Sequence, residues 1–249
     1  MRLTRIHVPG ELAAGSEITL PAQAAEHLTR VLRLEAGAPL TVFNGRGGEY
    51  SAVLATRKGK TVTARLGNHD AIDRESPLDI TLLQGVARGE RMDLIVQKAT
   101  ELGVTRIVPV LAERTVVKVD AKQRERKLVH WQSVAISACE QCGRNRVPEV
   151  GAPVGLGDAM AALPAGGLRC LLAADGEDSL ATAAYGANAA VVLLIGPEGG
   201  LAENERRLAG VHGFRAHRLG PRILRTETAG LAALAVLQAI QGDLGPCRP

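Results

Sequence analysis

Short apolar segments alternate with segments of helical periodicity over most of the chain, and this alternation begins at Leu78. Parallel strands need a connection that crosses the sheet, and this connection is usually a helix. The pattern therefore predicts an α/β fold in which helices cover both faces of a parallel sheet. The expected strands lie within 78–87, 106–112, 168–175, 190–196 and 215–220. The expected helices span 91–104, about 121–142, 202–211 and about 226–241.

The first 72 residues follow a different pattern, which is typical of a small β-domain. One helix is expected over 21–37, with Pro21 near its start and Gly37 after its end. The polar stretch 68–77 is the expected linker, and it divides the chain into a β-barrel domain, 1–72, and an α/β domain, 73–249. Five β-rich segments, separated by Gly, Pro and Asn, are the expected strands of the barrel: 5–9, 16–21, 39–45, 48–59 and 61–68.

Charge and composition limit the kinds of partner. The chain has 30 Lys and Arg against 26 Asp and Glu, and four arginines but no acid lie between Arg215 and Arg225. Such a basic stretch is typical of either a solvated surface or a contact with a polyanion. Aromatic residues make up only 2% of the chain, so stacking on aromatic side chains is not its main way of binding a nucleic acid.

The sequence predicts neither a membrane span nor an export signal. No apolar run approaches the roughly 18 residues that a transmembrane helix needs. The N-terminal stretch MRLTRIHVPG has neither the apolar core nor the cleavage site of a signal peptide. We therefore expect a cytoplasmic protein whose thiols stay reduced.

Common metal and nucleotide motifs are absent or incomplete. Cys139 and Cys142 form a CxxC sequence, but no second pair of Cys or His lies close enough to complete a zinc site. The pair also lies inside a predicted helix, so we expect buried small side chains and no metal. The sequence has no GxGxxG after the first α/β strand, and no GxxxxGK[ST], GxSxG or HExxH motif. The glycine-rich FNGRGGEY, 43–50, joins two expected strands and predicts a hairpin turn.

Three expected strands end in unusual loops: LLAADGED (171–178), LLIGPEGG (193–200) and HRLGPRILRTETAG (217–230). In an open parallel sheet, loops at the carboxyl ends of the strands form the ligand crevice. Glu198 in the second loop would repel a phosphate, whereas a lining of backbone amides, Gly, Leu and Ile suits an adenine ring and a ribose. The residues expected to line this pocket are Leu172, Ala173, Ile195, Gly196, Pro197, Gly199, Gly200, Leu219, Gly220, Ile223, Leu224 and Thr226.

The third loop leads into a helix through Thr226, Glu227 and Thr228, whose side chains are of the type that caps helix N-termini. Capping alone would explain these residues. Arg225 is different, because a helix N-terminus already attracts anions and gains no stability from a cation. Arg225 is therefore a candidate for contact with a negatively charged group.

Taken together, LIGPEGG, LGPRILRTETA, RMDLIVQKATELGV with IVPV, and ACEQCGRNRVPEV resemble the ribosomal RNA small subunit methyltransferase E family. EHLTRVLRLEAG and FNGRGGEY also resemble its N-terminal pattern, so the similarity covers nearly the whole chain. The chain departs from the family pattern at Leu201, where an aromatic residue is expected, at Gly230, where Pro is expected, and at Asn44, where Asp is expected.

The resemblance implies a fold and an activity that the residue pattern alone does not predict. It implies a trefoil-knotted SPOUT methyltransferase domain with a parallel sheet, preceded by a PUA-like RNA-binding β-barrel domain. Knots are so rare that topology rules alone would exclude one. The cofactor would be S-adenosyl-L-methionine, and the enzyme would be a homodimer. It would methylate N3 of a specific uridine in the small-subunit (16S) ribosomal RNA.

Residue roles follow from this expected reaction. Arg225 would stabilise the negative charge that develops on the uridine ring as its imide proton leaves. Glu198 and Glu227 are the nearby carboxylates, and either could accept that proton. Glu198 could equally favour the cationic sulfonium of the cofactor or hydrogen-bond backbone amides.

RNA contacts are expected from basic side chains, because RNA phosphates need cations. Arg144 and Arg146 follow a helix end, so complementing the helix dipole is their alternative role. Two other functions stay open: an RNA-binding module without catalysis, and a SPOUT methyltransferase with another RNA target. The expected RNA contacts are Arg30, Arg33, Arg88, Arg91, Arg114, Lys118, Arg144 and Arg146.

Overall fold

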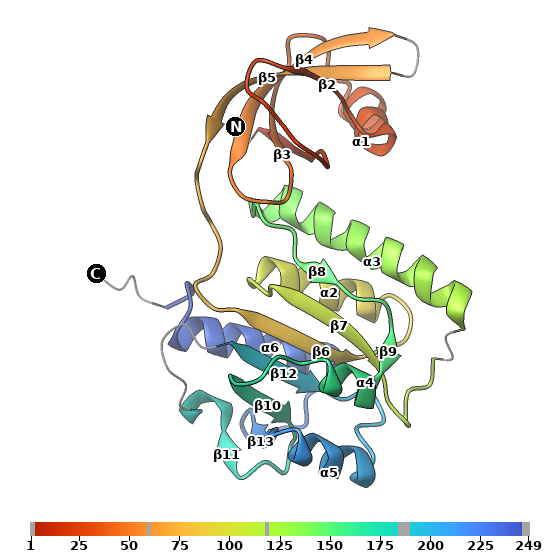
Figure 1. The fold of residues 1–249 in the computed structure, drawn as a ribbon, viewed down its shortest axis with the longest axis vertical. Helices are drawn as coiled ribbons and strands as arrows, with labels where there is room; N and C mark the ends of the chain where they lie inside the picture. The colour runs from red at the N-terminus through yellow and green to blue at the C-terminus, as the bar shows by residue number, and fades with distance from the viewer. Residues whose placement is uncertain (1–2, 59–60, 118–119, 184–189, 246–249) are drawn as a thin grey trace. The chain divides into compact units, whose positions relative to one another are not determined.

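Two sheets organise the chain, one in each of two compact units (Figure 1). The computed structural model describes residues 3–58, 61–117, 120–183 and 190–245. The first unit comprises Met1–Glu75 together with Cys139–Val147, and the second comprises Ser76–Ala138 together with Pro148–Pro249. The sequence divided the chain once, after residue 72. The structure divides it after Glu75 and also assigns residues 139–147 to the first unit.

The first unit contains a five-stranded sheet with the strand order β1-β3-β4-β5-β2. The strands β1 and β3 are parallel, and the other neighbours are antiparallel. Each predicted strand segment overlaps one of these strands, although β1 begins one residue earlier and β5 ends two residues later than predicted, and the turn over 43–50 joins β3 to β4 as predicted. Their bounds are β1 (Thr4–His7), β2 (Glu17–Thr19), β3 (Pro39–Phe43), β4 (Glu49–Lys58) and β5 (Thr61–Asp70).

The helix predicted over 21–37 is wrong at its C-terminal end. The structure has α1 (Ala22–Glu26), which continues as the π-helical turn η1 (His27–Val31). Arg33 then takes a left-handed backbone conformation with φ of 53°, and the N–H of Leu34 donates to the carbonyl of Leu28. Leu34 packs against the core of the first unit, so its apolar character continued the helical pattern beyond the true end of the helix.

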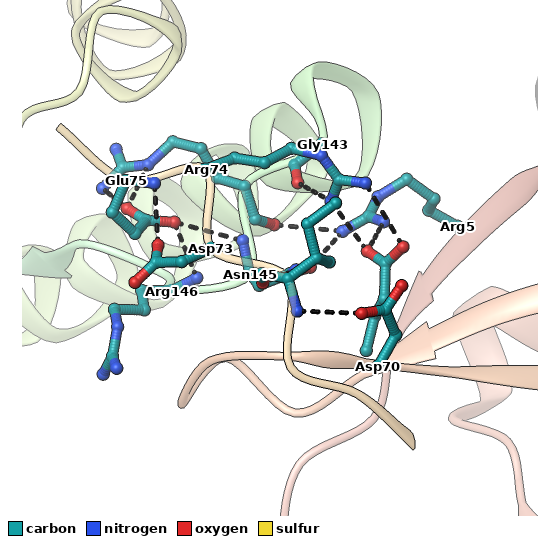
Figure 2. Close-up of polar contacts among 11 residues, drawn as sticks. Arg5, Asp70, Asp73, Arg74, Glu75, Gly143, Asn145 and Arg146 are labelled. Atoms are coloured by element: carbon teal, nitrogen blue, oxygen red, sulfur yellow. Dashed lines mark hydrogen bonds and ion pairs between the residues drawn. The ribbon is translucent and has the colours of Figure 1, made fainter. Parts of the chain in front are cut away.

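Residues 139–147 join the first unit through a network of ion pairs and hydrogen bonds (Figure 2). Arg5 is buried; its guanidinium pairs with Glu49 and donates to the Arg144 carbonyl (3.2 Å) and to the side-chain oxygen of Asn145. The carboxylate of Glu75 accepts the N–H groups of Asn145 and Arg146, both at 3.1 Å. It also pairs with the guanidinium of Arg144 at 2.6 Å. These contacts fix a segment that is distant in sequence from the rest of the unit.

This network predicts a stability difference that depends on pH. Burial raises the pKa of Glu49, but hydrogen bonds from Arg74 and Arg5 lower it more, to about 2. The folded-state pKa is below the unfolded value, so the ionised carboxylate stabilises the fold above about pH 4.5. That stabilisation is lost as the pH falls towards 2. We expect Glu49→Gln to lower the free energy of unfolding by about 2 kcal/mol at pH 7 and by clearly less at pH 3.

Urea unfolding followed by circular dichroism at both pH values measures this difference. Glu11→Gln is the matched control, because Glu11 pairs with Arg46 while its side chain is 89% exposed. Such exposed pairs contribute little, so this variant should unfold like the wild type at both pH values. An equal loss for Glu49→Gln at pH 7 and pH 3 would contradict the expectation.

The second unit contains a parallel sheet with the strand order β11-β13-β10-β12-β6-β7-β8, and β9 pairs with β7. The predicted α/β architecture with a parallel sheet is confirmed. The strands are β6 (Ile80–Gly85), β7 (Arg106–Leu111), β8 (Glu149–Val150), β9 (Val154–Gly155), β10 (Leu168–Leu172), β11 (Asp178–Ser179), β12 (Val191–Ile195) and β13 (Arg215–Arg218). The helices are α2 (Arg91–Glu101), α3 (Ala121–Cys142), α4 (Leu156–Ala161), η2 (Leu180–Thr182), α5 (Glu203–Val211) and α6 (Thr226–Ile240), and the last residues of α3, from Cys139 on, belong to the first unit.

Helices cover both faces of this sheet. Successive residues of a strand point to opposite faces, so neighbouring residues of one strand pack against helices on opposite sides. Leu83 and Leu194 form one core cluster with Met160 of α4 and Ala209 of α5. On the other face, Gly230 of α6 lies close to Leu82 and Ile195. These two residues are the direct neighbours of Leu83 in β6 and of Leu194 in β12. The strands β13, β10 and β12 are neighbours and run parallel to one another. The loops that follow them therefore all leave the sheet at the carboxyl ends of its strands (Figure 1).

Candidate active site

A cavity of about 700 Å³ lies at the carboxyl ends of β10, β12 and β13, between the three loops singled out in the sequence. Three of the expected lining residues, Gly199, Leu219 and Gly220, are not in its wall. For the nine expected residues that do line the cavity, contact with a ligand stays a prediction. Nine expected residues do line it: Leu172, Ala173, Ile195, Gly196, Pro197, Gly200, Ile223, Leu224 and Thr226.

The GPEGG loop (196–200) is held in position by the close approach of its backbone to the end of β6. A Cβ atom on Gly85 would lie 2.3 Å from the nitrogen of Pro197, so this contact requires glycine at the end of β6. The loop closes as a turn in which the N–H of Gly200 donates to the carbonyl of Pro197 at 2.8 Å, with Gly200 at a φ of 68°. The glycines thus serve backbone packing on one side and open the cavity on the other.

Glu198 is held by two nitrogen donors. Its Oε1 accepts the backbone N–H of Arg88 at 3.0 Å and the Nη1 of Arg91 at 3.1 Å. Partial burial raises the pKa of Glu198, but hydrogen bonds from these two residues and its own N–H lower it below the ordinary value for Glu. Glu198 is therefore a negative charge in the cavity wall at neutral pH.

Arg91 connects this carboxylate to a second one. Its Nε lies 3.7 Å from the Oε1 of Glu227, in the first turn of α6. The side chain of Glu227 is 14% exposed, and its Oε2 is buried with no hydrogen-bond partner among the described residues. All three side chains line the cavity.

Arg225 occupies the N-cap position of α6, is exposed and lines the cavity. Its carbonyl accepts the N–H of Ala229 at 2.8 Å, which begins the helix. The side chain has no role in capping, in agreement with the argument that helix stability does not require a cation there.

Several cavity residues were not expected from the sequence. Arg206 of α5 pairs with Asp175 through two hydrogen bonds of 2.9 Å, and both residues line the cavity. Arg91 and Arg114 also line it, although they were expected only as RNA contacts. Arg114 donates to the carbonyl of Gly199 at 3.2 Å. The sequence around a charged residue in a helix or loop does not predict contacts with residues so far away in the chain.

The remaining expected RNA contacts have different environments. Arg30, Arg33, Arg88 and Arg146 are exposed, although Arg30 pairs with Glu26 at 2.6 Å. Arg144 is only 6% exposed and pairs with Glu75, which argues against a phosphate contact. Lys118 lies outside the described residues.

The CxxC cysteines belong to the first unit. Burial raises the pKa of Cys139 to about 12, so its thiol is protonated at neutral pH, and its Sγ lies 3.7 Å from the carbonyl of Arg146. Cys142 is partly buried. Over the described ranges, no group of three or more His, Cys, Asp or Glu side chains is arranged to hold a metal ion. In the same ranges, no helix has the length and apolarity needed to cross a membrane.

Comparisons with known proteins agree with this architecture. An RNA methyltransferase domain family matches residues 74–238, and an RNA methyltransferase PUA domain family matches residues 20–67. A methyltransferase structure from Legionella pneumophila with bound SAM is 42% identical, with a TM-score of 0.92, and the match covers 98% of this chain and all of that one. A ribosomal RNA small subunit methyltransferase E structure from Neisseria gonorrhoeae, bound to S-adenosyl methionine, is 38% identical with a TM-score of 0.90, covering 97% and 99% of the two chains.

Curated relatives are similar in sequence over most of this chain. The ribosomal RNA small subunit methyltransferase E of Buchnera aphidicola subsp. Schizaphis graminum is 32% identical over 252 residues, which cover 98% of each chain. That of Synechocystis is 35% identical, covering 95% of this chain and 77% of the relative. The resemblance inferred from the sequence is therefore confirmed: the chain belongs to the ribosomal RNA small subunit methyltransferase E family.

Proposed function

We propose that this protein uses S-adenosyl-L-methionine to methylate N3 of one uridine in small-subunit ribosomal RNA. The observation that carries the proposal is the cavity between the three loops, which is lined by both the exposed Arg225 and the ionised Glu198. A ring nitrogen that loses a proton needs a nearby cation, and a cationic methyl donor is favoured by a nearby carboxylate. Both charges are present in one pocket.

The residues present fit the cofactor. A cavity of about 700 Å³ lies within the range of small-molecule sites. Its wall combines apolar side chains (Leu172, Ile195, Leu224) with glycine backbone and the carboxylate of Glu198, which disfavours a phosphate but not a cation. When bound, S-adenosyl-L-methionine supplies a methyl group on a sulfonium. The three loops would hold it, with the apolar side chains against the adenosine.

The reaction requires the uridine imide to lose its proton while the ring is held in line for attack. Arg225 stabilises the resulting negative charge. Glu198 already accepts two hydrogen bonds through Oε1 and has a lowered pKa, so we assign it to orienting Arg91 and keeping negative charge beside a cationic ligand. Glu227, whose Oε1 lies 3.7 Å from the Nε of Arg91 and whose Oε2 has no hydrogen-bond partner among the described residues, is the better-placed proton acceptor.

RNA binding would use exposed arginines on both units, chiefly Arg30, Arg33, Arg88 and Arg146, with Arg91 and Arg114 close to the reacting base. The first unit, which the PUA family matches over 20–67, would act as a PUA-like barrel that contributes to this contact. Phosphate contacts release counterions, so affinity should fall steeply with salt. The substrate implies a cytoplasmic site of action.

We further propose a trefoil knot in the second domain, 73–249, and a homodimer, both from the family resemblance. Leu231, Ala232 and Ala235 give α6 a partly exposed apolar face that a second subunit could cover. Sedimentation that found only monomer at micromolar concentration would refute the dimer.

The test of the proposed function is methyl transfer from labelled S-adenosyl-L-methionine to small ribosomal subunits and to free small-subunit RNA. We expect one methyl group per RNA, on uridine, and mass spectrometry with chromatographic standards separates N3, ring-carbon and ribose products. Cofactor binding without transfer to either substrate would favour an RNA-binding module without catalysis. A methyl group on another atom or nucleotide would refute the N3 assignment.

A further inference from the structure

Gln84 is a fully buried polar residue in β6, one residue before the glycine that contacts the GPEGG loop. It is not in the wall of the cavity. A strand that is buried on both faces is normally apolar throughout, as its neighbours Leu82 and Leu83 are. Gln84 therefore requires an explanation in terms of its hydrogen bonds.

The side-chain amide of Gln84 begins a chain of hydrogen bonds with a defined direction. Its Nε2 donates to the hydroxyl of Thr226 at 2.9 Å and to the carbonyl of Gly85 at 3.0 Å. The hydroxyl of Thr226 has one proton, and it donates this proton to the carbonyl of Gly196 at 2.6 Å. Thr226 can therefore accept from Gln84 only through a lone pair, so the donor sequence is fixed.

This chain joins three parts of the fold that are distant in sequence. Gln84 lies in β6, Thr226 is the first residue of α6, and Gly196 is the first residue of the GPEGG loop. The neighbours of the last two residues line the cavity: Arg225 and Glu227 flank Thr226, and Pro197 and Glu198 follow Gly196. Displacing Thr226 would therefore move two loops of the cavity at once.

The hydrogen bonds of Gln84 are not optimal for stability alone. Its Oε1 is buried without a partner among the described residues and faces Gly230, where an added Cβ would be 3.1 Å away. An apolar side chain would avoid this desolvation cost. The residue is better explained by the position that its donor group imposes on Thr226.

We propose that Gln84 is a positioning residue for the cofactor site. Through Thr226 it fixes the start of α6 against the GPEGG loop, and so sets the separation of the two walls that carry Arg225 and Glu198. The effect on S-adenosyl-L-methionine rests on the proposed function, but the effect on the loops does not.

Gln84→Met tests this inference, with Gln238→Met as the matched control. Gln238 is also fully buried and, like Gln84, does not line the cavity; it donates to the carbonyl of Leu102 at 2.9 Å and accepts from Ser76 at 2.7 Å, and neither of these partners lines the cavity. Both variants lose buried hydrogen bonds, so both should melt at a lower temperature. Only Gln84→Met should weaken S-adenosyl-L-methionine binding, by about tenfold in calorimetry well below the melting temperature.

Amide hydrogen exchange on the free protein provides a second readout. Gly200 N–H is bonded to Pro197 and Ala229 N–H to Arg225, so these two amides report on the two loops. We expect both to exchange faster in Gln84→Met and to keep their wild-type rates in Gln238→Met. This comparison decides the inference even if the wild-type protein does not bind S-adenosyl-L-methionine, a result that would refute the proposed function alone.

A double variant tests whether Gln84 acts through Thr226. Thr226→Val removes the hydroxyl with little change of volume, and it should weaken cofactor binding by about tenfold. Adding Gln84→Met should then cause no further loss, whereas independent effects would multiply to about a hundredfold. Cofactor affinity of Gln84→Met within threefold of the wild type, loop exchange equal to that of Gln238→Met, or independent effects would each overturn the proposal.

Discussion

Replacing Arg225 by alanine is expected to slow methyl transfer by about a hundredfold, the usual effect of removing one donor that stabilises a developing negative charge. Arg225 is exposed at the N-cap of α6 and makes no side-chain capping bond, so the fold should tolerate the change. Single-turnover transfer at saturating cofactor and RNA isolates the chemical step. Cofactor affinity should change far less than this rate, because the charge develops only during the reaction.

Arg222→Ala is the matched control for this experiment. Arg222 is an exposed arginine of the same loop, but it does not line the cavity. Its removal should weaken RNA binding at most and leave the single-turnover rate unchanged. A rate for Arg225→Ala within about threefold of the wild type, a barrier change below ~0.7 kcal/mol, would exclude its proposed role.

Replacing Gly85 by alanine is expected to weaken S-adenosyl-L-methionine binding by more than tenfold. The new Cβ would lie 2.3 Å from the nitrogen of Pro197 and 2.6 Å from the carbonyl carbon of Gly196. Backbone atoms at these distances have to move, and the GPEGG loop is the part that can move into the cavity. Overpacking of this kind also destabilises a fold by about 1–3 kcal/mol. Calorimetry and thermal unfolding measure the two effects.

Gly210→Ala provides the control, because Gly210 lies exposed in α5 and an added Cβ would meet no atom within 4 Å. Alanine favours helix over glycine, so this variant should be slightly more stable and bind the cofactor normally. Wild-type cofactor affinity in Gly85→Ala would show that the loop position is not set by this contact.

Periodicity predicted most of the second unit because its strands are buried on both faces. Runs such as Val191–Ile195 are fully apolar, and the amphipathic helices between them begin and end close to the expected residues. The crevice was also predictable, since the position of loops at carboxyl ends of parallel strands follows from the topology alone. Glu198, within one such loop, was recognisable for the same reason.

Features set by non-local contacts were not predictable in this way. The end of the first helix depends on the left-handed backbone of Arg33 and on Leu34 packing against the core. Apolar periodicity predicts neither of these features. Arg144 follows a helix end, where exposed cations are common, yet its partner Glu75 lies 69 residues away. Gln84 stands out in the sequence only as a polar residue in an apolar run, and its hydrogen-bond partner Thr226 lies 142 residues away.

The assignment of residues 139–147 to the first unit has a consequence for synthesis of the chain. Arg5 and Glu75 have their partners Arg144, Asn145 and Arg146 on this late segment. A nascent chain that has passed Glu75 therefore lacks these partners until Val147 has left the ribosome. At about 5–20 residues per second this delay lasts several seconds, during which the N-terminal part is incomplete. The same dependence means that a fragment ending at Glu75 should be less stable than its size suggests, and that adding a peptide of residues 139–147 should stabilise it.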